Sequence, residues 1–441
     1  MSIEMLHAMN GAACSCGKTH SFSAKVVTGA GVVHQLPEIL AGMGAKKPFL
    51  LTDRNTWKAA GAQVAEILAS AKIPYSSYSL PEDAPKPDEQ RVGSAVMHFD
   101  HSCDAVIGIG SGVVNDIGKI LAATAKLPYI IVGTAPSMDG YASATSSMTR
   151  DGLKISLPSK GADVIIGDTE ILCKAPDRLL KAGLGDMLAK FVSICEWRIA
   201  KELVGEYYCP QIAQLIRSAV RLCVDGAEGL LRREPQAVQA VFEGLVIGGV
   251  AMNYAGLSRP ASGCEHYLSH LIDMRSVEFG TAEDLHGTQC AIGTLVMLRL
   301  YEKLREITPN REKALAYAQS FDFADWSAQL RQLLGKGAES MIAQEAKEGK
   351  YDLAAHEKRL EVILEKWECL LQIMAEELPA SKDLEALLDT IQAPKTLGEI
   401  GVEETLLPIF FMATKDIRDK YVLSRLAWDL GILEELAETL K

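Results

Sequence analysis

Residues Asp104–Lys119 read DAVIGIGSGVVNDIGK, and this stretch decides the fold that the sequence predicts. A short apolar run leads into a turn with three glycines, Gly108, Gly110 and Gly112, and a helical pattern follows. A buried strand that turns through glycines into a helix is typical of a parallel α/β unit whose turn binds a pyrophosphate. Val113 stands where a Rossmann loop has its third glycine, so a plain tight turn is an alternative interpretation.

The chain around this stretch alternates short apolar runs with helical patterns. We expect a parallel sheet covered by helices, because strands and helices that alternate along a chain usually fold that way. The predicted strands are Pro48–Thr52, Ala105–Ile109, Tyr129–Val132 and Val164–Ile166, and the predicted helices include Trp57–Ser70, Glu89–Phe99 and Val113–Ala125. We assign residues 1–174 to an α/β, dinucleotide-binding domain.

The pattern of apolar residues changes from about Pro176 onward. Apolar residues recur at spacings of three and four, and strand patterns nearly disappear, so residues 175–441 are predicted to form an all-α domain. The segment Gln344–Met374 is rich in Glu, Lys and Leu, and we interpret it as one or two amphipathic helices that decorate the surface.

Composition restricts the class of protein. The 441 residues suit two domains, and 48% hydrophobic with 23% charged residues is typical of a globular chain. A net charge of −12 argues against a nucleic-acid or anionic-membrane partner. The first ten residues do not resemble a signal peptide, and we see no long apolar run that suggests a membrane span. We therefore expect a cytoplasmic protein whose ten cysteines are reduced thiols.

Polar residues follow two other predicted strands at the end where ligands of parallel sheets bind. Asp53 ends the first strand and can hold an adenosine ribose hydroxyl, although a helix cap is its commoner role. The segment Gly133–Ser143, GTAPSMDGYAS, follows the third strand. Its Thr134 and Ser137 can bond a nicotinamide or a phosphate, and Asp139 can meet substrate hydroxyls. A capped turn is the alternative.

Three segments of the helical half carry metal-type ligands in apolar surroundings. Asp186 lies in GLGDMLAK, His266 and His270 lie four apart in ASGCEHYLSHLID, and His286 opens HGTQCAIG. One aspartate with two histidines leaves coordination positions open, as a catalytic metal site requires. Each segment has an ordinary interpretation as a helix cap or a surface pair, and the residues alone do not establish that the three meet.

A further group of possible ligands lies near the N-terminus. Cys14, Cys16 and His20 occur in CSCGKTH. This spacing is tighter than in ordinary zinc motifs, and the sequence offers no evident fourth ligand. We interpret the segment as a surface turn.

Taken together, these stretches resemble the glycerol-1-phosphate dehydrogenases, which are members of the iron-containing alcohol dehydrogenase and dehydroquinate synthase superfamily. The matching stretches run in family order from about Cys14 to Leu433. They are GIGSGVVNDIGK, GTAPSMDGYASATSSM, AGLGDMLAK, PASGCEHYLSHLID, HGTQCAIG and IRDKYVLSRLAWDLG. The resemblance implies an α/β dinucleotide-binding domain followed by a helical domain that binds metal and substrate.

The resemblance also implies roles for individual residues. The implied metal ligands are Asp186, His266 and His286, and the implied catalytic residues are Asp139, Asp186 and His270. The implied cofactor contacts are Asp53, Gly110, Gly112, Val113, Val114, Asn115, Asp116, Thr134, Ala135, Pro136, Ser137 and Ser143.

The resemblance implies an NAD- or NADP-linked oxidoreductase that interconverts dihydroxyacetone phosphate and sn-glycerol 1-phosphate in phospholipid biosynthesis. It uses one divalent metal ion, and zinc, nickel and iron all tolerate the ligand set. A homodimer or larger homo-oligomer is expected. A glycerol or polyol dehydrogenase, a dehydroquinate synthase-like cyclase and a non-catalytic nucleotide sensor remain alternatives. Lys154 and Lys160 are weak candidates for holding a substrate phosphate.

Overall fold

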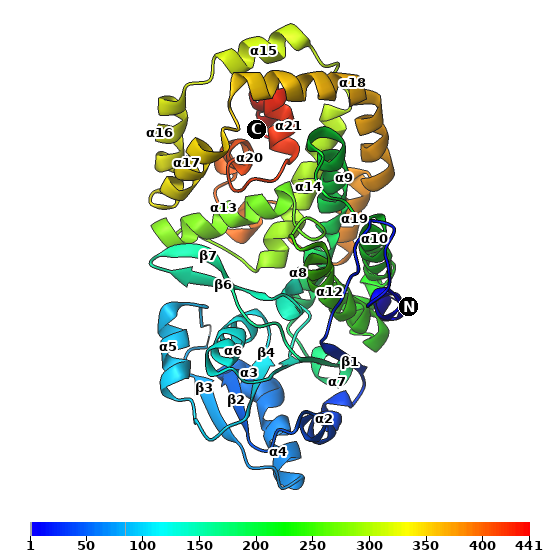
Figure 1. Ribbon diagram of the computed structural model, residues 1–441, viewed down its shortest axis with the longest axis vertical. Helices are drawn as coiled ribbons and strands as arrows, with labels where there is room; N and C mark the ends of the chain where they lie inside the picture. The colour runs from blue at the N-terminus through cyan, green and yellow to red at the C-terminus, as the bar shows by residue number, and fades with distance from the viewer. Residues whose placement is uncertain (1, 84) are drawn as a thin grey trace. The chain divides into compact units, whose positions relative to one another are not determined.

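The computed structural model describes residues 2–83 and 85–441, which form two compact units (Figure 1). The sheet unit comprises Met1–Met187 and Gln214–Leu257, and the helical unit comprises Leu188–Ala213 and Ser258–Lys441. This grouping places the helical residues Gln214–Leu257 in the same unit as the sheet. It therefore differs from the single domain boundary after residue 174 that the sequence predicted. That division into functional domains stays a prediction.

The sheet unit is built on six parallel strands in the order β1-β8-β5-β4-β2-β3. The four predicted strands are confirmed, and each is buried at every residue. The two strands that the sequence did not reveal lie at the edges, where partial burial requires no apolar run. The strands are β1 (Lys25–Gly29), β2 (Pro48–Asp53), β3 (Ser76–Leu80), β4 (Ala105–Gly110), β5 (Tyr129–Gly133) and β8 (Val164–Asp168).

The strand order reverses between β2 and β4. After β2 the chain moves outward to β3, whereas after β4 it moves the other way to β5. Ligands of open parallel sheets bind outside the carboxyl ends of the strands at such a point. Asp53 ends β2 and Gly110 ends β4, so both candidate cofactor residues lie at the expected crevice.

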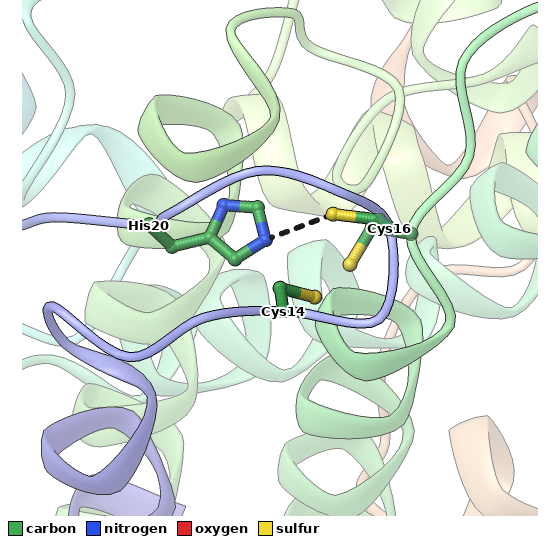
Figure 2. A group of neighbouring side chains, drawn as sticks. Cys14, Cys16 and His20 are labelled. Carbon is green, nitrogen blue, oxygen red and sulfur yellow. Dashed lines mark hydrogen bonds between the residues drawn. The ribbon is translucent and has the colours of Figure 1, made fainter.

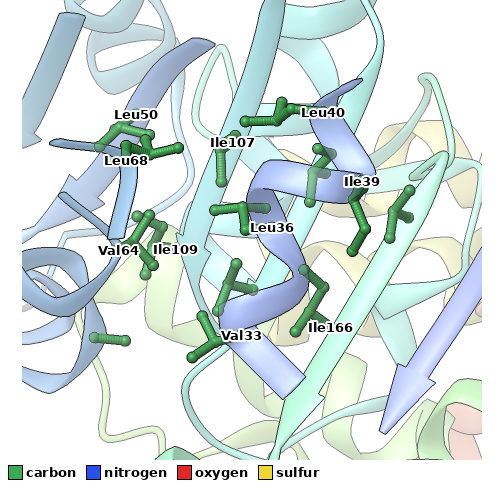
Figure 3. Close-up of a cluster of buried hydrophobic side chains, with 14 of the residues drawn as sticks. Val33, Leu36, Ile39, Leu40, Leu50, Val64, Leu68, Ile107, Ile109 and Ile166 are labelled. Atoms are coloured by element: carbon green, nitrogen blue, oxygen red, sulfur yellow. The ribbon is translucent and has the colours of Figure 1, made fainter. Parts of the chain in front are cut away.

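An apolar cluster packs one face of the sheet against the helices that precede and follow β2 (Figure 3). Val33 and Leu36 come from η1 and α2, Val64 comes from α4, and Ile107 and Ile166 come from the strands. Each buried aliphatic side chain of this kind contributes about 1.5–3 kcal/mol. The helices of this unit are α1 (Ser2–Met9), η1 (Val32–Gln35), α2 (Leu36–Met43), α3 (Arg54–Thr56), η2 (Trp57–Gly61), α4 (Ala62–Ser70), α5 (Glu89–Met97), α6 (Gly112–Ala125), η3 (Asp139–Tyr141), α7 (Thr169–Leu172), α8 (Asp177–Leu188), α10 (Pro210–Asp225, from Gln214 onward), α11 (Ala227–Leu231) and α12 (Pro235–Ala255).

A two-stranded antiparallel ribbon, β6 (Thr145–Arg150) and β7 (Leu153–Pro158), follows β5 and was not predicted. Its turn is Asp151–Gly152, and both residues have positive φ angles of 53° and 74°. Asp-Gly between two strands is a common two-residue hairpin turn. This pair of residues is therefore the signal in the sequence from which the ribbon could have been predicted.

Helix α12 is the one helix in the described residues that is long and apolar enough to cross a membrane by length and composition. Of its most apolar window, 72% is buried inside the structure. Its Phe242 ring occupies the space above Gly133 and Gly167 of the sheet. Burial against a sheet is the usual reason for such composition in a core helix.

Every regular element after Pro176 is a helix, both in the helical unit and in the part of the chain grouped with the sheet, which confirms the all-α prediction for this half. They are α9 (Lys190–Val204), α13 (Cys264–Phe279), α14 (His286–Leu304), α15 (Arg311–Gln319), α16 (Phe323–Leu334), α17 (Gly337–Glu348), α18 (Leu353–Glu377), α19 (Ser381–Thr390), η4 (Gly398–Ile400), η5 (Glu404–Leu406), α20 (Leu407–Thr414), α21 (Leu423–Asp429) and α22 (Leu433–Glu438).

The interpretation of Gln344–Met374 as surface decoration was wrong for most of α18. Leu360, Ile363, Trp367 and Leu370 are buried on one face of this helix, and α18 packs against α9. The spacing of three and four between these residues is that of a core-facing stripe. The many Glu and Lys residues of the opposite face obscured that stripe in the composition.

Candidate functional site

The glycine loop connects β4 to α6 at the carboxyl edge of the sheet. Gly110 pairs with Gly133 of β5, so the two candidate cofactor loops start side by side. A Cβ atom at Gly110 would lie 2.5 Å from the Cβ of Val114, too close to be accommodated. Helix α6 begins at Gly112, and the N-terminus of a 14-residue helix favours an anion. This loop fits a pyrophosphate.

Two residues of the predicted loop face inward within the sheet unit. The Asn115 amide donates from Nδ2 to the Gly140 carbonyl at 2.9 Å, and the Tyr129 hydroxyl donates to Asn115 Oδ1. Asp116 pairs with Lys119 at 2.9 Å, and burial raises the pKa of its carboxyl. These contacts indicate that Asn115 and Asp116 brace the loop. Their predicted contact with the cofactor stays a prediction.

The segment after β5 is held rigidly against helix α8. The Pro136 carbonyl oxygen occupies the space where Gly183 would carry a side chain, so only glycine fits at position 183. Within the segment, the Tyr141 hydroxyl donates to the Ala135 carbonyl at 2.5 Å. Thr134 and Ser137 are buried beside these bonds. The contact at Gly183 therefore fixes where this loop runs relative to α8.

Asp186 lies on α8, three residues after Gly183, and its side chain is fully buried. The Asp139 backbone N–H donates to Asp186 Oδ2 at 2.9 Å. The two acidic residues predicted for catalysis and metal binding are therefore adjacent in the sheet unit. A carboxylate oriented by a backbone N–H is a typical metal ligand.

Helix α12 supports the same loop from another side. The Asn253 amide donates to the Ala142 carbonyl at 2.8 Å. A Cβ atom at Gly249 would lie 2.8 Å from the Asp139 carbonyl oxygen and 3.2 Å from the Ser143 nitrogen. The loop backbone thus rests directly on α12. Ser143 itself bonds to Thr145 at 2.8 Å between their hydroxyls, which is a local role.

Asp53 caps the short helix α3 at the end of β2. Its Oδ1 atom accepts hydrogen bonds from the backbone N–H groups of Asn55 and Thr56, both at 2.8 Å. The alternative of a helix cap is thus confirmed. The cap uses one carboxylate oxygen, so it is compatible with the predicted ribose contact through Oδ2.

The predicted histidines converge within the helical unit. His266 lies on α13 and His286 opens α14, and their ring centroids are 5.0 Å apart. His270, one turn after His266, lies with its ring 6.2 Å from that of His286 and nearly parallel to it. The HxxxH spacing and the later His286 therefore form one cluster, as the sequence could suggest but not establish.

Each of the two candidate ligands is oriented by a hydrogen bond at Nδ1. His266 Nδ1 lies 2.8 Å from Glu265 Oε1, and His286 Nδ1 lies 3.1 Å from Ser269 Oγ. The Gln289 amide donates to Ser269 Oγ at 2.9 Å. Imidazoles held in this way present the Nε2 lone pair, which is the arrangement of metal-ligating histidines.

Two residues of this cluster were not predicted from the sequence. Glu265 precedes His266 and is fully buried. Cys290 lies one turn after His286, and its Sγ is 3.6 Å from His286 Nε2. Burial works against ionisation of this thiol, but the two histidines prevail and lower its pKa. The spacing of four between His286 and Cys290 placed both on one helix face and could have revealed the thiol.

A second buried acid lies behind the cluster. Glu196 of α9 accepts from the backbone N–H of Cys264 at 2.9 Å and from that of Leu423 at 2.8 Å. Burial and the nearby Glu265 carboxylate raise the pKa of Glu196 to about 8. This acid connects the start of α13 to the chain before α21.

Cations of the helical unit gather near the same helix start. The Lys420 ammonium donates to the Ser262 carbonyl at 2.7 Å. Desolvation, with the charges of Arg259 and Arg418, lowers the pKa of Lys420 to about 7. By contrast, Lys160 pairs with Asp163 at 2.8 Å in the sheet unit and is occupied there. Lys154 lies on the partly buried ribbon strand β7.

Residues 27–176 match the family model described as iron-containing alcohol dehydrogenase. This match runs from the middle of β1 to beyond β8 and includes the glycine loop and the segment after β5.

Curated relatives cover more of the chain and share one name, glycerol-1-phosphate dehydrogenase [NAD(P)+]. The relative from Methanothrix thermoacetophila is 35% identical over 279 residues, which are 63% of this chain and 77% of the relative. The one from Bacillus velezensis is 32% identical over 302 residues, 66% of this chain and 77% of the relative. The one from Bacillus licheniformis is 27% identical over 429 residues, 96% of this chain and 94% of the relative.

Solved structures share the fold at lower identity. The chain is similar to an NADH-dependent butanol dehydrogenase from Thermotoga maritima with a TM-score of 0.59 and 18% identity, over 95% of this chain and 98% of that one. It is also similar to a sulfoacetaldehyde reductase from Bifidobacterium kashiwanohense in complex with NAD+, with a TM-score of 0.61 and 14% identity over the same shares. These likenesses concern the fold alone.

Proposed function

The chain belongs to the glycerol-1-phosphate dehydrogenases, and on that premise we propose that it is a metal-dependent, NAD(P)-linked oxidoreductase that interconverts dihydroxyacetone phosphate and sn-glycerol 1-phosphate. The observation that carries this proposal is the identity of 31–35% to relatives of that name of which the chain covers 71–77%. The reaction would supply the glycerol phosphate backbone of phospholipids.

The residues of the sheet unit fit a dinucleotide. Gly110 lets the loop pass close to Val114, and the N-terminus of α6 at Gly112 offers backbone N–H groups to a pyrophosphate. Asp53 ends β2, on the other side of the strand reversal, where it is placed to bind the ribose. Thr134 and Ser137 are candidates for nicotinamide contacts. Asp53 favours NAD, because its carboxylate repels a 2′-phosphate. The remaining proposed contacts of these loops are Val113, Val114, Asn115, Asp116, Ala135, Pro136 and Ser143.

We propose that Asp186, His266 and His286 hold one divalent cation. The donor set fits such an ion, because Asp139 orients the carboxylate and Glu265 and Ser269 orient the imidazoles. When bound, the ion supplies Lewis acidity toward the substrate oxygen at C2. Zinc, nickel and iron are all compatible with one carboxylate and two imidazoles.

The chain's own residues bind and orient the reactants. In the proposed reduction a hydride passes from C4 of the nicotinamide to C2 of dihydroxyacetone phosphate, and a proton reaches the C2 oxygen. His270 and Asp139 are the proposed groups that orient the substrate hydroxyls and move this proton. The rigid support of the Asp139 loop by Gly183 and Gly249 would keep the two reacting carbons aligned.

The substrate phosphate needs a cation, and we propose Lys420. Its ammonium lies at Ser262, just before the start of α13, together with the charges of Arg259 and Arg418. A lysine with a lowered pKa gains a proton when a phosphate dianion approaches, so binding would be reinforced. A glycerol dehydrogenase would have no need for this group.

The assembly and location remain proposals of the same kind. We propose a homodimer or a larger homo-oligomer in the cytoplasm, with a small-molecule substrate and with neither nucleic acid nor membrane as partner. The acidic net charge of −12 supports the absence of a polyanionic partner.

The test of the proposed function is a set of initial rates with the purified protein. We expect NADH or NADPH oxidation with dihydroxyacetone phosphate to exceed that with dihydroxyacetone at least about 100-fold, because the lost phosphate contacts are charged. In reverse, sn-glycerol 1-phosphate should reduce NAD(P)+, whereas glycerol and sn-glycerol 3-phosphate should not. Preference for glycerol would establish the polyol dehydrogenase instead. Turnover of dehydroquinate precursors without net NADH would establish the cyclase.

A further inference from the structure

The N-terminal segment forms a small closed loop that the proposed reaction does not use. An antiparallel bridge joins Ala13 to Thr19, and the Cys14 backbone N–H donates to the Lys18 carbonyl at 3.0 Å. The turn between them is tightened by Gly17, whose φ is +83°. The loop therefore brings residues 14, 16 and 20 together on one side. Figure 2 shows their side chains pointing toward one another.

His20 is inward-facing and fixed. Only 2% of its surface is exposed, which contradicts the interpretation of this residue as part of a surface turn. Its Nδ1 lies 3.2 Å from the Tyr254 carbonyl oxygen at the end of α12, and its Nε2 lies 3.4 Å from Cys16 Sγ. An imidazole whose Nδ1–H bonds to a backbone carbonyl presents Nε2 as a ligand, as metal-bound histidines usually do.

The ligand atoms are spaced as a metal site requires. The two Sγ atoms and the histidine nitrogen lie within 4.8 Å of one another. Zn–S and Zn–N bonds of about 2.3 and 2.0 Å in a tetrahedron place their donor atoms about 3.5–3.8 Å apart. The observed 3.4 Å between Cys16 Sγ and His20 Nε2 is close to that value. Two thiols and an imidazole select soft or borderline ions such as Zn²⁺ over Mg²⁺ or Ca²⁺.

We propose that Cys14, Cys16 and His20 bind a structural zinc ion, distinct from the ion of the proposed catalytic site. The three side chains supply three of the four positions of a tetrahedral centre, and a further ligand completes it. Ion binding deprotonates the two thiols and releases their protons to solvent, with no change in oxidation state.

The position of the loop suggests what the ion stabilises. His20 contacts Tyr254, which is the penultimate residue of α12. Asn253, its neighbour, holds the Ala142 carbonyl of the loop that carries Asp139. The Tyr254 hydroxyl also donates to the Leu6 carbonyl of α1. The zinc ion would thus fasten the N-terminal segment to the helix end that supports the loop after β5.

Metal analysis of the purified full-length chain tests the proposal. We expect about two divalent metal ions per chain in the wild type, at least one of them zinc, and about one ion with one fewer zinc in the Cys14→Ser/Cys16→Ser variant. The His266→Ala/His286→Ala variant should also retain about one, and it is the thiol-ligated ion that should remain there. A Cys173→Ser variant is the matched control, because this partly exposed thiol lies in the same unit and in none of the ligand groups of the described residues. It should keep both ions.

Cobalt substitution identifies the ligands independently of activity. Co²⁺ bound to the His266→Ala/His286→Ala variant should show the near-ultraviolet thiolate-to-cobalt charge-transfer band. A His20→Cys change should keep the ion and intensify that band, so this variant remains informative if the serine variants fold poorly. An unchanged metal content in Cys14→Ser/Cys16→Ser, or no charge-transfer band in the histidine variant, would overturn the proposal. Both of these results would leave the proposed dehydrogenase function standing, because that function is tested separately by the rates with dihydroxyacetone phosphate.

Discussion

The two regions that carry the candidate site are built in different ways. In the sheet unit, glycines place backbone directly against backbone, as where Gly183 meets the Pro136 carbonyl. In the helical unit, buried polar side chains orient one another, as Glu265 orients His266. The first kind of region is visible in a sequence as a glycine motif. The second is not, because any apolar helix can carry a buried Glu or Gln. Tolerance to substitution should differ accordingly.

The largest effect should come from the histidines themselves. His266→Ala or His286→Ala should lower kcat/KM for dihydroxyacetone phosphate by about 10³-fold or more, because Lewis-acid stabilisation is worth several kcal/mol. Bound metal at the catalytic site should fall in parallel. Circular dichroism should show the fold retained. Full activity in a variant that has lost this metal would indicate that the ion is structural, as the alternative of a non-catalytic nucleotide sensor requires.

Next in size is the backbone contact of the sheet unit. Gly183→Ala should lower kcat by about 10²-fold, because the new methyl group displaces the loop at Pro136 and moves Asp139 from its place. Gly93→Ala is the matched control, since its added Cβ meets nothing within 4 Å on helix α5. That change should leave the rate unaltered and stabilise the helix by about 0.5–1 kcal/mol. Equal rates in both variants would refute the rigid-loop account.

Removing a buried polar contact of the helical unit should have a smaller effect than disturbing the backbone contact at Gly183. Glu265→Gln should reduce metal affinity about 10–100-fold, because the amide orients the His266 ring less strongly than the carboxylate does. A chelator titration measures this, with Glu312→Gln on the exposed face of α15 as the control. If affinity does not change, Glu265 is a packing residue and the comparison between the two regions loses half of its support.

A smaller and more selective effect is expected at Lys420. Lys420→Met should lower kcat/KM for dihydroxyacetone phosphate about 10-fold, because one charge-assisted hydrogen bond to phosphate is lost. The rate with unphosphorylated dihydroxyacetone should stay nearly constant, which separates a phosphate contact from a general structural role. Equal losses with both substrates would exclude the proposed contact.

The smallest effect concerns pH. The pKa of Glu196 is raised to about 8 in the folded chain by burial and by Glu265, so the folded state holds a proton that the unfolded state has released above pH 4.5. Stability from this group therefore falls as pH rises from about 4.5 to 8. Glu196→Gln should flatten that decline in thermal unfolding scans. An unchanged decline in the variant would show that the carboxyl is already ionised in the folded chain.

The sequence predicted the sheet well where burial is complete. The four central strands are short, continuous apolar runs bounded by Gly, Pro or Asp, and these runs located them, whereas the edge strands Lys25–Gly29 and Ser76–Leu80 lack such runs. Helix α18 was misjudged for a related reason, since charges on one face hid the stripe from Leu360 to Leu370. Sequence patterns are thus most informative when both faces of an element have the same environment.

The site was predicted as ligand types and not as geometry. His266, His270 and His286 were identified from spacing and resemblance, and the structure brings them together in the helical unit. The partners Glu265 and Cys290 were missed, because their importance depends on which helix face meets which neighbour. Asn115 and Asp116 were assigned to the cofactor by position in a motif. The contact of Asn115 with the Gly140 carbonyl depends on tertiary packing, whereas Asp116 pairs with Lys119 one turn later on the same helix.

The most direct test of the central claim is a metal titration of the apo-enzyme, followed by the rate of NADH oxidation with dihydroxyacetone phosphate. The wild type, stripped by a chelator, should be inactive and regain its rate in proportion to the ion bound by Asp186, His266 and His286. The Asp186→Asn variant should regain little at the same metal concentration. Full activity of the stripped enzyme, or equal recovery in the variant, would contradict the account.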